Sequence, residues 1–91
     1  MDSMSTATAK AEPIAVRAWV TDRMVHIELA DQRQFAFPAD RFSRLKAAPD
    51  HLLKEVAIEV NGFALRWDSV DEDISVPGVV AGHFELPPVE I

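Results

Sequence analysis

Apolar and polar side chains alternate along three stretches in the first half of the chain. Such an alternation, of period two, is typical of a β-strand that turns one face to the core. The apolar positions of the first two stretches are Ile14, Val16, Ala18 and Val20, followed after the turn Thr21-Asp22-Arg23 by Val25, Ile27 and Leu29. In the third stretch, Phe35 and Phe37 share a face and Pro38 ends the strand. The pattern predicts a meander of three antiparallel strands.

The period changes after this meander. Phe42 and Leu45 lie three residues apart, as on one side of a helix, and Asp40 can cap the helix start. This spacing predicts a helix over residues 40–47. A second helical segment should follow over residues 49–55, because a proline is tolerated and an aspartate is favoured in a first helical turn.

Two further alternating stretches, residues 56–60 and 63–67, flank the dipeptide Asn61-Gly62. Asn-Gly in this position is the strongest short-range signal of a β-hairpin, since a type I′ turn needs positive φ at both central residues. The whole pattern predicts an α+β fold. We expect an antiparallel sheet of about five strands, made of the meander, a helical segment and the Asn-Gly hairpin, with short helices on one face.

The segment RWDSVDEDISV, residues 66–76, holds four carboxylates within six residues. Three of its residues have the 1-3-5 spacing of a calcium-binding loop: Asp71, Asp73 and Ser75. The positions of the turn glycine and the bidentate glutamate are taken by Val76 and Gly82, so the EF-hand template fails. A different oxygen site for Ca²⁺ or Mg²⁺ in the acidic 68–73 segment stays open as an alternative.

The same segment also matches a structural joint, which is the preferred interpretation. Ser69 and Glu72 have the spacing of a capping box, in which each side chain accepts from the other residue's backbone amide. Asp71 and Asp73 would then lie in the first helical turn, where negative charge is favourable. Ser75 can cap a short terminal helix. The predicted joint, which stops the last strand and starts a helix, consists of Ser69, Asp71, Glu72 and Asp73.

Composition limits the classes of function. With 91 residues, 48% of them apolar and no cysteine, the chain is expected to form one small domain without a disulfide or a thiolate metal site. Its formal net charge of -6 repels nucleic-acid phosphate, so direct nucleic-acid binding is not expected. No apolar run reaches the ~18 residues of a membrane span and no signal-peptide pattern is present, so we expect a cytoplasmic protein.

The two ends of the chain differ from its middle. Residues 1–12 are small and polar without a hydrophobic period, which predicts a disordered N-terminal tail. Residues 83–91 are expected to be a flexible C-terminal tail, because Pro87-Pro88 can join neither a helix nor a sheet interior. A single α+β domain is therefore expected over residues 13–82.

Sequence motifs for catalysis are missing. The three histidines lie far apart without ligand spacing, no serine sits in a Gly-x-Ser-x-Gly turn, and the three glycines form no phosphate-binding loop. Hydrolysis by paired carboxylates needs no sequence proximity, but so small a core leaves little room for a water-excluding pocket. We therefore expect no enzymatic activity, no metal site and no cofactor.

Trp19 and Trp67 are the remaining anomalies. Trp19 lies on the opposite face of its strand from the isoleucine and valines, and Trp67 ends the last predicted strand. Each can be buried under a helix or a neighbouring side chain, the commoner outcome for tryptophan, or exposed beside arginines as in a binding hot spot. Under the second interpretation the partner-binding residues are Arg17, Trp19, Arg41, Arg44, Arg66 and Trp67.

Several motifs in the chain resemble one family. They are DQR after the second strand, FPADRFSRL running into AAPD, the NGFALRW hairpin and, most specifically, DEDISVPGVV after Trp67. On these motifs, about residues 13–82 resemble the bacterial domain-of-unknown-function family numbered 2442 (DUF2442), a group of small α+β proteins. The chain departs from the family pattern at Gln32, where glycine is usual, and at Arg66, where histidine is usual.

The resemblance implies little about chemistry but something about partners. Members of the family are mostly uncharacterised, are often encoded beside another small protein in what looks like a toxin–antitoxin pair, and are sometimes fused to a helix-turn-helix domain. We therefore expect a non-catalytic protein-interaction module whose partner is a small protein encoded by a neighbouring gene. The antitoxin-like member of such a pair is the more specific form of this expectation. The alternative is a small metal- or ligand-binding protein that uses the acidic 68–73 segment.

Overall fold

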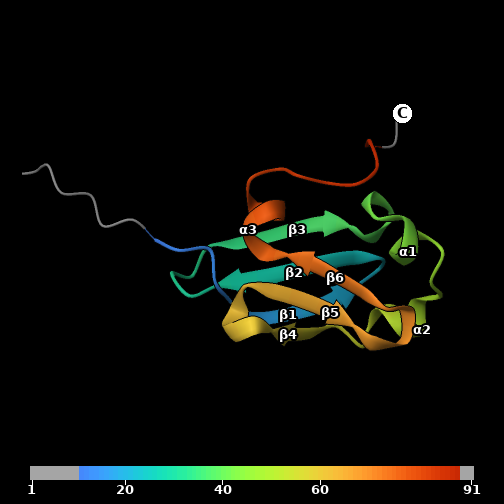
Figure 1. The fold of residues 1–91 in the computed structure, drawn as a ribbon, viewed down its shortest axis with the longest axis horizontal. Helices are drawn as coiled ribbons and strands as arrows, with labels where there is room; N and C mark the ends of the chain where they lie inside the picture. Colours follow the sequence, from blue (N-terminus) through green and yellow to red (C-terminus); the bar gives the residue numbers. More distant parts are fainter. Residues whose placement is uncertain (1–10, 89–91) are drawn as a thin grey trace, which may run out of the picture.

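The structure is a computed structural model that describes residues 11–88, and it confirms an α+β fold with antiparallel strands. The strands form two sheets, with the orders β1-β2-β3 and β4-β5-β6, and not one sheet of five. Each sheet therefore comes from one contiguous stretch of the chain (Figure 1). The strands are β1 (Ala15–Thr21), β2 (Met24–Leu29), β3 (Gln34–Pro38), β4 (Ala57–Glu59), β5 (Ala64–Trp67) and β6 (Glu72–Ser75).

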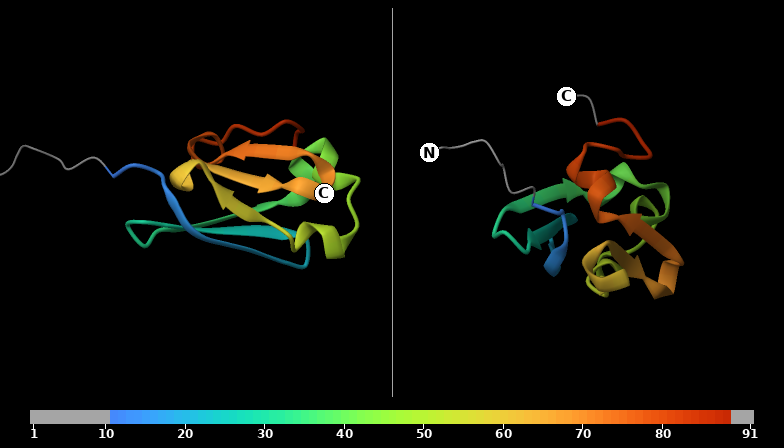
Figure 2. Two further views of the ribbon diagram at one scale, coloured as in Figure 1. Left: turned by 60° about the horizontal axis from the view of Figure 1, so that its bottom comes forward. Right: turned by 60° about the vertical axis from the view of Figure 1, so that its left-hand side comes forward.

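The two sheets form two layers, and their inner faces enclose the core (Figure 2). The helices α1 (Ser43–Lys46) and α2 (Asp50–Leu53) lie at one end, between β3 and β4, whereas α3 (Val76–Val80) follows β6. The expectation that helices cover one face of a sheet is wrong, because the second sheet occupies that face. The largest fully buried side chains are Trp67, Ile27, Leu29, Leu45, Leu53, Leu65, Val25 and Val76.

A β-bulge in β1 changes which residues face the core. Ala15 pairs with Leu29 and Arg17 pairs with Glu28, so two steps along β1 match one step along β2. Ala15 is buried, whereas Val16 is 52% exposed. The predicted alternation therefore holds only on the C-terminal side of the bulge.

The second hairpin forms as predicted, but its turn differs from a type I′ turn at Asn61-Gly62. Glu59 pairs with Ala64, which leaves four residues in the loop, and the 3-10 helix η2 (Val60–Gly62) occupies three of them. Positive φ angles occur at Val60 (52°), Asn61 (54°) and Gly62 (94°). Val60, predicted to face the core, is 67% exposed. The positive φ expected at Asn61 and Gly62 is therefore present, but the loop is two residues longer than a type I′ turn, and Gly62 lies against the entry of the chain into β1.

Replacing Gly62 by alanine should destabilise the fold more than replacing Gly82 by alanine. Both glycines have positive φ, so both substitutions introduce backbone strain. Only at Gly62 would the added Cβ collide, with the side chain of Ile14 and at 2.7 Å from the carbonyl oxygen of Ala15, whereas nothing lies within 4 Å at Gly82. We expect about 1–3 kcal/mol more loss of unfolding free energy at Gly62. Urea titrations of both variants measure this difference, and equal losses would show that the contact with Ile14 and Ala15 does not explain the glycine.

The helix predicted over residues 40–47 is divided in two. The 3-10 helix η1 (Ala39–Arg41) and α1 are separated by Phe42, whose backbone is extended, and Asp40 makes no side-chain cap. The extended backbone places the Phe42 ring against Phe37, with centroids 5.8 Å apart. The second predicted segment is confirmed as α2. No helix within residues 11–88 is long and apolar enough to cross a membrane.

Residues 83–88 belong to the segment that the sequence predicts as a flexible tail, and they pack against η1 and α1. We call residues 83–88 the strap. Phe84 joins Phe37 and Phe42 in an aromatic cluster, with ring centroids 5.7 and 5.9 Å away. The packed body therefore extends past residue 82. The remainder of both predicted tails, residues 1–10 and 89–91, lies outside the described residues.

Candidate functional site

The outer face of the first sheet carries a cluster built around Trp19. The register pairs Trp19 with His26, and their rings stack with centroids 5.2 Å apart and planes 3° apart. The guanidinium of Arg17 lies 4.4 Å from the Trp19 ring centroid. Nη1 of Arg17 also donates to Oε1 of Glu28 at 2.8 Å. We call this cluster the Trp19 face, made of Arg17, Trp19, Thr21, His26 and Glu28.

The Trp19 face is held in one arrangement by its own contacts. The hydroxyl of Thr21 lies 2.9 Å from Nε2 of His26, which fixes the imidazole against the indole. Trp19 is half-buried by its neighbours, while Arg17 and Thr21 are exposed. Trp19 and His26 alternate along their strands with the buried Val20 and Val25, so the Trp19 face points away from the core between the two sheets. A surface ordered in advance loses little side-chain entropy when a partner binds.

The acidic 68–73 segment is organised by an arginine. Arg66 donates from Nε to Asp68 at 2.6 Å, from Nη2 to Asp71 at 3.0 Å and from Nη1 to Asp73 at 2.7 Å. Hydrogen bonds to these carboxylates raise the pKa of Arg66, and the hydrogen bond to Asp71 contributes most. Arg44 donates to the backbone carbonyl of Asp71 and lies 3.7 Å from its carboxylate. The segment is therefore a set of ion pairs within the protein.

The predicted capping box is wrong. The hydroxyl of Ser69 donates to Oε1 of Glu55 at 2.6 Å, and Oε1 of Glu72 accepts from the amide of Asp73. The chain forms the 3-10 helix η3 (Asp68–Val70), turns at Asp71 with φ 53°, and continues as β6 instead of a helix. Pairing with β5 prevails because it buries Ile74 opposite Leu65. The predicted cap at Ser75 is confirmed, since its hydroxyl accepts from the amide of Gly78 at 3.0 Å.

Glu72 occupies an unusual position for a carboxylate. The register places Glu72 opposite the buried Trp67, and burial raises the pKa of the Glu72 carboxyl above its ordinary value. The negative charge of Glu85 raises this pKa further, while the amide of Asp73 and the charge of Arg44 oppose the shift. A group with this shift disfavours the folded state slightly as pH rises through its titration, so it is a cost to stability at neutral pH.

The six residues predicted to bind a partner do not form one surface. Arg17 and Trp19 lie together on the Trp19 face. Arg41 contacts the strap, and Trp67 is fully buried in the core, so Trp67 cannot serve as an exposed anchor. Arg44 and Arg66 both contact the acidic segment.

His26, Glu28 and Thr21 belong to the Trp19 face but are not predicted as site residues from the sequence. The signal that could have found them is the alternation of the second strand, if the turn before it is counted as two residues. The sequence suggested the three-residue turn 21–23, whereas Thr21 pairs with Met24 and only Asp22 and Arg23 form the turn. Counting back from that pair puts His26 opposite Trp19.

Millimolar Ca²⁺ or Mg²⁺ should leave the melting temperature of the protein unchanged. No group of three or more histidine, aspartate or glutamate side chains within residues 11–88 is arranged to hold a metal ion, and Arg66 already occupies the space between the carboxylates. If a site existed, the metal ion at a concentration of 100 times its Kd would raise the free energy of unfolding by ~2.7 kcal/mol and clearly raise the melting temperature. Arg66→Gln is the matched variant, because it removes the guanidinium that pairs with these carboxylates. A rise in the wild-type protein would contradict the ion-pair interpretation.

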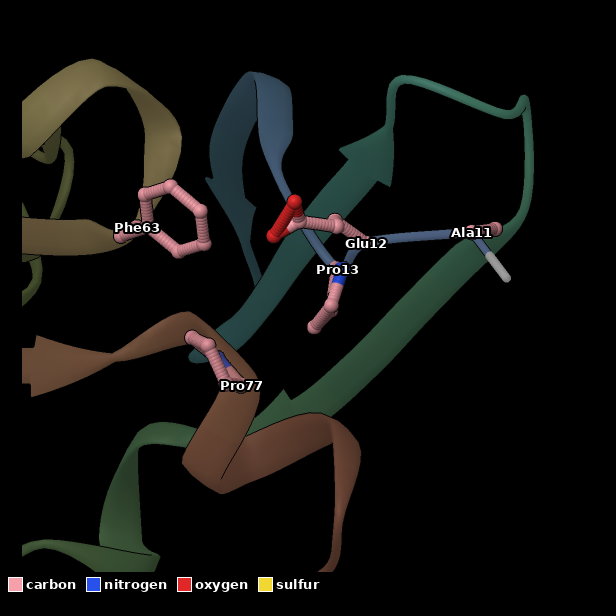
Figure 3. Close-up of a pocket in the computed structure, with 5 residues that line it drawn as sticks. All are labelled: Ala11, Glu12, Pro13, Phe63 and Pro77. Atoms are coloured by element: carbon pink, nitrogen blue, oxygen red, sulfur yellow. The ribbon is translucent and has the colours of Figure 1, made fainter. Parts of the chain in front are cut away.

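A hollow of about 450 Å³ lies where the chain enters β1 (Figure 3). The hollow is lined by Ala11, Glu12, Pro13, Phe63 and Pro77, and Glu12 extends across it toward Phe63. Glu12 is the only ionisable side chain among these lining residues. A single carboxylate beside apolar groups, without a second acid, base or nucleophile, gives this hollow no catalytic arrangement.

Comparisons with known proteins agree with the fold. None of the curated proteins matches the chain. A crystal structure of a protein of unknown function from Rhodospirillum rubrum is 36% identical, with a TM-score of 0.76 over 80% of this chain and 90% of that one. A solution NMR structure of an uncharacterized protein from Chromobacterium violaceum, 21% identical, shares the fold with a TM-score of 0.66 over 76% of this chain and 65% of that one. Residues 15–85 match the family described as "Protein of unknown function (DUF2442)", and the chain belongs to that family.

Proposed function

We propose that this protein is a non-catalytic protein-interaction module that binds its partner through the Trp19 face. The observation that carries the proposal is the stack of Arg17, Trp19 and His26 on the outer face of the first sheet. Tryptophan and arginine are the residues most enriched among binding hot spots. The stack presents both residues in a fixed geometry. Neither Arg17 nor Trp19 belongs to the buried core.

The charge of the chain favours a basic partner. The formal net charge of the full sequence is -6. On the Trp19 face itself, the pair of Arg17 and Glu28 leaves a nearly neutral aromatic centre. Opposite charges on two proteins raise the rate of association, whereas a buried aromatic centre slows dissociation. Nucleic acid is a poor candidate partner on the same charge argument.

The partner we propose is the small protein encoded by a neighbouring gene, in the cytoplasm, with this chain as the antitoxin-like member of the pair. The family resemblance supports this identity, and the Trp19 face supports only the existence of a binding surface. The alternative, a metal- or ligand-binding protein that uses the acidic 68–73 segment, is less favoured because Arg66 pairs with three of the carboxylates.

Trp19→Ala should weaken the complex with this partner by ~2 kcal/mol or more, as expected when a central aromatic anchor is truncated. Calorimetric titration of the purified proteins measures the loss. Raising the salt concentration should slow association more than it speeds release, because the attraction between net charges is screened. A thermal melt of the free variant, followed by circular dichroism, checks that the domain still folds.

Arg17→Ala tests the Trp19 face, and Arg33→Ala is its matched control. Each removes one exposed arginine that pairs with a carboxylate, at 2.8 Å to Glu28 and at 2.7 Å to Asp31. The change in net charge is the same, but Arg33 lies over the ring of Phe35 and not on the Trp19 face. Only Arg17→Ala should weaken the complex. Equal effects, or no binding by the wild-type protein, would contradict the proposal.

A further inference from the structure

The strap packs against a surface made by β3, η1 and the start of α1. We call this the Arg41 surface, made of Phe37, Arg41, Phe42 and the backbone amide of Ser43. Three consecutive strap residues, Phe84, Glu85 and Leu86, make the contacts with it. Figure 1 shows the strap running from α3 across to η1 and α1 at the far end of β3. The strap is thus bound in the way that an extended peptide is bound.

The first strap residue on the Arg41 surface is an aromatic anchor. The ring of Phe84 packs against Phe37 and Phe42, with centroids 5.7 and 5.9 Å away. The guanidinium of Arg41 lies 4.1 Å from the centroid of the Phe84 ring. Two aromatic rings and a cation around the Phe84 ring favour an aromatic side chain at this position.

The second strap residue, Glu85, is bound through its negative charge. Oε1 of Glu85 accepts a hydrogen bond of 2.6 Å from the amide of Ser43, which is the first residue of α1. This amide has no partner within the helix, so an external carboxylate satisfies it. The contact lowers the pKa of Glu85, and the positive charge of Arg44 acts in the same direction. An acidic residue is therefore favoured at this position.

The third residue is held by its main chain. The amide of Leu86 donates to the carbonyl of Arg41 at 2.8 Å, and the carbonyl of Leu86 accepts from Nε of Arg41 at 2.8 Å. Both polar groups of one peptide residue are satisfied by one residue of the Arg41 surface. Such contacts bind any extended segment, while the side-chain contacts before it select the sequence.

Little of the strap is buried. Phe84 and Leu86 are only half-buried, and His83, Glu85 and Pro87 are exposed. Gly82, which precedes the strap, ends α3 with φ 89°, and the amides of Gly82 and His83 donate to the carbonyls of Val79 and Gly78. A segment with little buried apolar surface belongs to the least stable parts of a fold.

We propose that the Arg41 surface is a binding site for an extended peptide of aromatic–acidic–aliphatic sequence, and that the strap is its intramolecular occupant. A partner segment of this chemistry binds by displacing the strap. The site is separate from the Trp19 face, on which this inference does not depend. A short tether presents the strap at an effective concentration on the order of millimolar, so the strap is a strong competitor for any added peptide.

The probe is a capped, fluorescently labelled peptide with the sequence of residues 82–88, GHFELPP, added to the full chain. Phe84→Ala in the protein removes the anchor of the strap and leaves the residues of the Arg41 surface unchanged. Fluorescence anisotropy should show at least about tenfold tighter binding of the peptide to Phe84→Ala than to the wild-type protein, because the internal competitor is weakened. Glu85→Gln, whose side chain is exposed, should give a smaller gain of the same sign and tests the proposal should Phe84→Ala fail to fold.

Two controls make the result specific. A probe with alanine in place of its phenylalanine should bind at least about tenfold more weakly, because it offers no ring to the Arg41 surface. Arg41→Ala, combined with Phe84→Ala, should abolish the gain. Equal binding to the wild-type protein and to both strap variants, or a gain that survives Arg41→Ala, would overturn the proposal.

Discussion

Replacing Trp67 by alanine should lower the free energy of unfolding by about 3–5 kcal/mol, the range for a large aromatic side chain removed from a core. Trp67 is fully buried and is the largest such side chain. Its Nε1 also donates to the carbonyl of Leu53 at 2.8 Å, which connects β5 to the end of α2. Urea unfolding followed by circular dichroism measures the loss. A loss below about 1 kcal/mol would mean that the two sheets do not depend on this side chain.

Two further variants separate the contributions of Trp67. Trp67→Phe keeps most of the apolar contact but leaves the carbonyl of Leu53 without its donor, which should cost about 1–3 kcal/mol. Trp19→Ala removes the same type of side chain from an outer face. It should cost clearly less than Trp67→Ala, because the cavity term is missing there. The reverse order would contradict the assignment of Trp67 to the core and Trp19 to the surface.

Arg23→Ala should lower the free energy of unfolding by about 2–4 kcal/mol, because several charge-assisted hydrogen bonds are lost together. Arg23 donates to the carboxylates of Asp50 at 2.8 Å and Asp40 at 3.1 Å, and the hydrogen bond to Asp50 is the largest cause of its raised pKa. The same guanidinium donates to three backbone carbonyls around α1, those of Leu45, Lys46 and Ala48. One side chain therefore fastens the β1–β2 turn to η1, α1 and α2.

Arg23→Lys distinguishes the shape of the guanidinium from its charge. Lysine keeps the charge but cannot place a planar fork of donors between the two carboxylates and the helix carbonyls. Most of the loss should therefore remain in Arg23→Lys. Arg33→Ala, at an exposed arginine with a single carboxylate partner, should have little effect. Full stability of Arg23→Lys would show that net charge alone is needed. The measurement is the denaturant midpoint of each variant.

The regular strands could be predicted from the sequence, and the irregular ones could not. Period-two alternation identifies the meander and the second hairpin, because each strand packs one face on the core. The segment that forms β6 has one apolar residue in contact with the core, Ile74, among carboxylates and a serine. The local sequence pattern of this segment favours a helix cap, whereas its pairing with β5 depends on tertiary contacts. The bulge at Val16 leaves no trace in the alternation for the same reason.

The turns of the two hairpins also differ from those that the sequence predicts. The hairpin with Asn61-Gly62 has a four-residue loop, whereas the two-residue turn with positive φ at both positions occurs at Asp22 (50°) and Arg23 (63°). Asn61 and Gly62 keep positive φ within this longer loop, and Gly62 closely approaches Ala15. The left-handed backbone of Arg23 is compensated by the contacts of its own side chain.

The candidate site could be predicted in part. Trp19 was conspicuous because a large aromatic residue stood on the polar face of its strand, and Arg17 was its neighbour on that face. Their contacts with His26 depend on the register, which a turn longer by one residue would change. The strap could not be predicted, since its proline pair suggests an end of regular structure and gives no sign of the aromatic cluster that Phe84 completes.

The origin of each sheet from one contiguous stretch has a consequence for how the chain folds. Strand pairing within each sheet closes only short loops, so it costs little chain entropy, whereas the meeting of the two layers joins segments far apart in the sequence. Neither layer can bury its inner face alone, so each half depends on the other for stability. A break at the exposed turn of Lys54 and Glu55 would sever no strand pairing. The domain is in this sense made of two complementary halves that the Lys54–Glu55 turn joins.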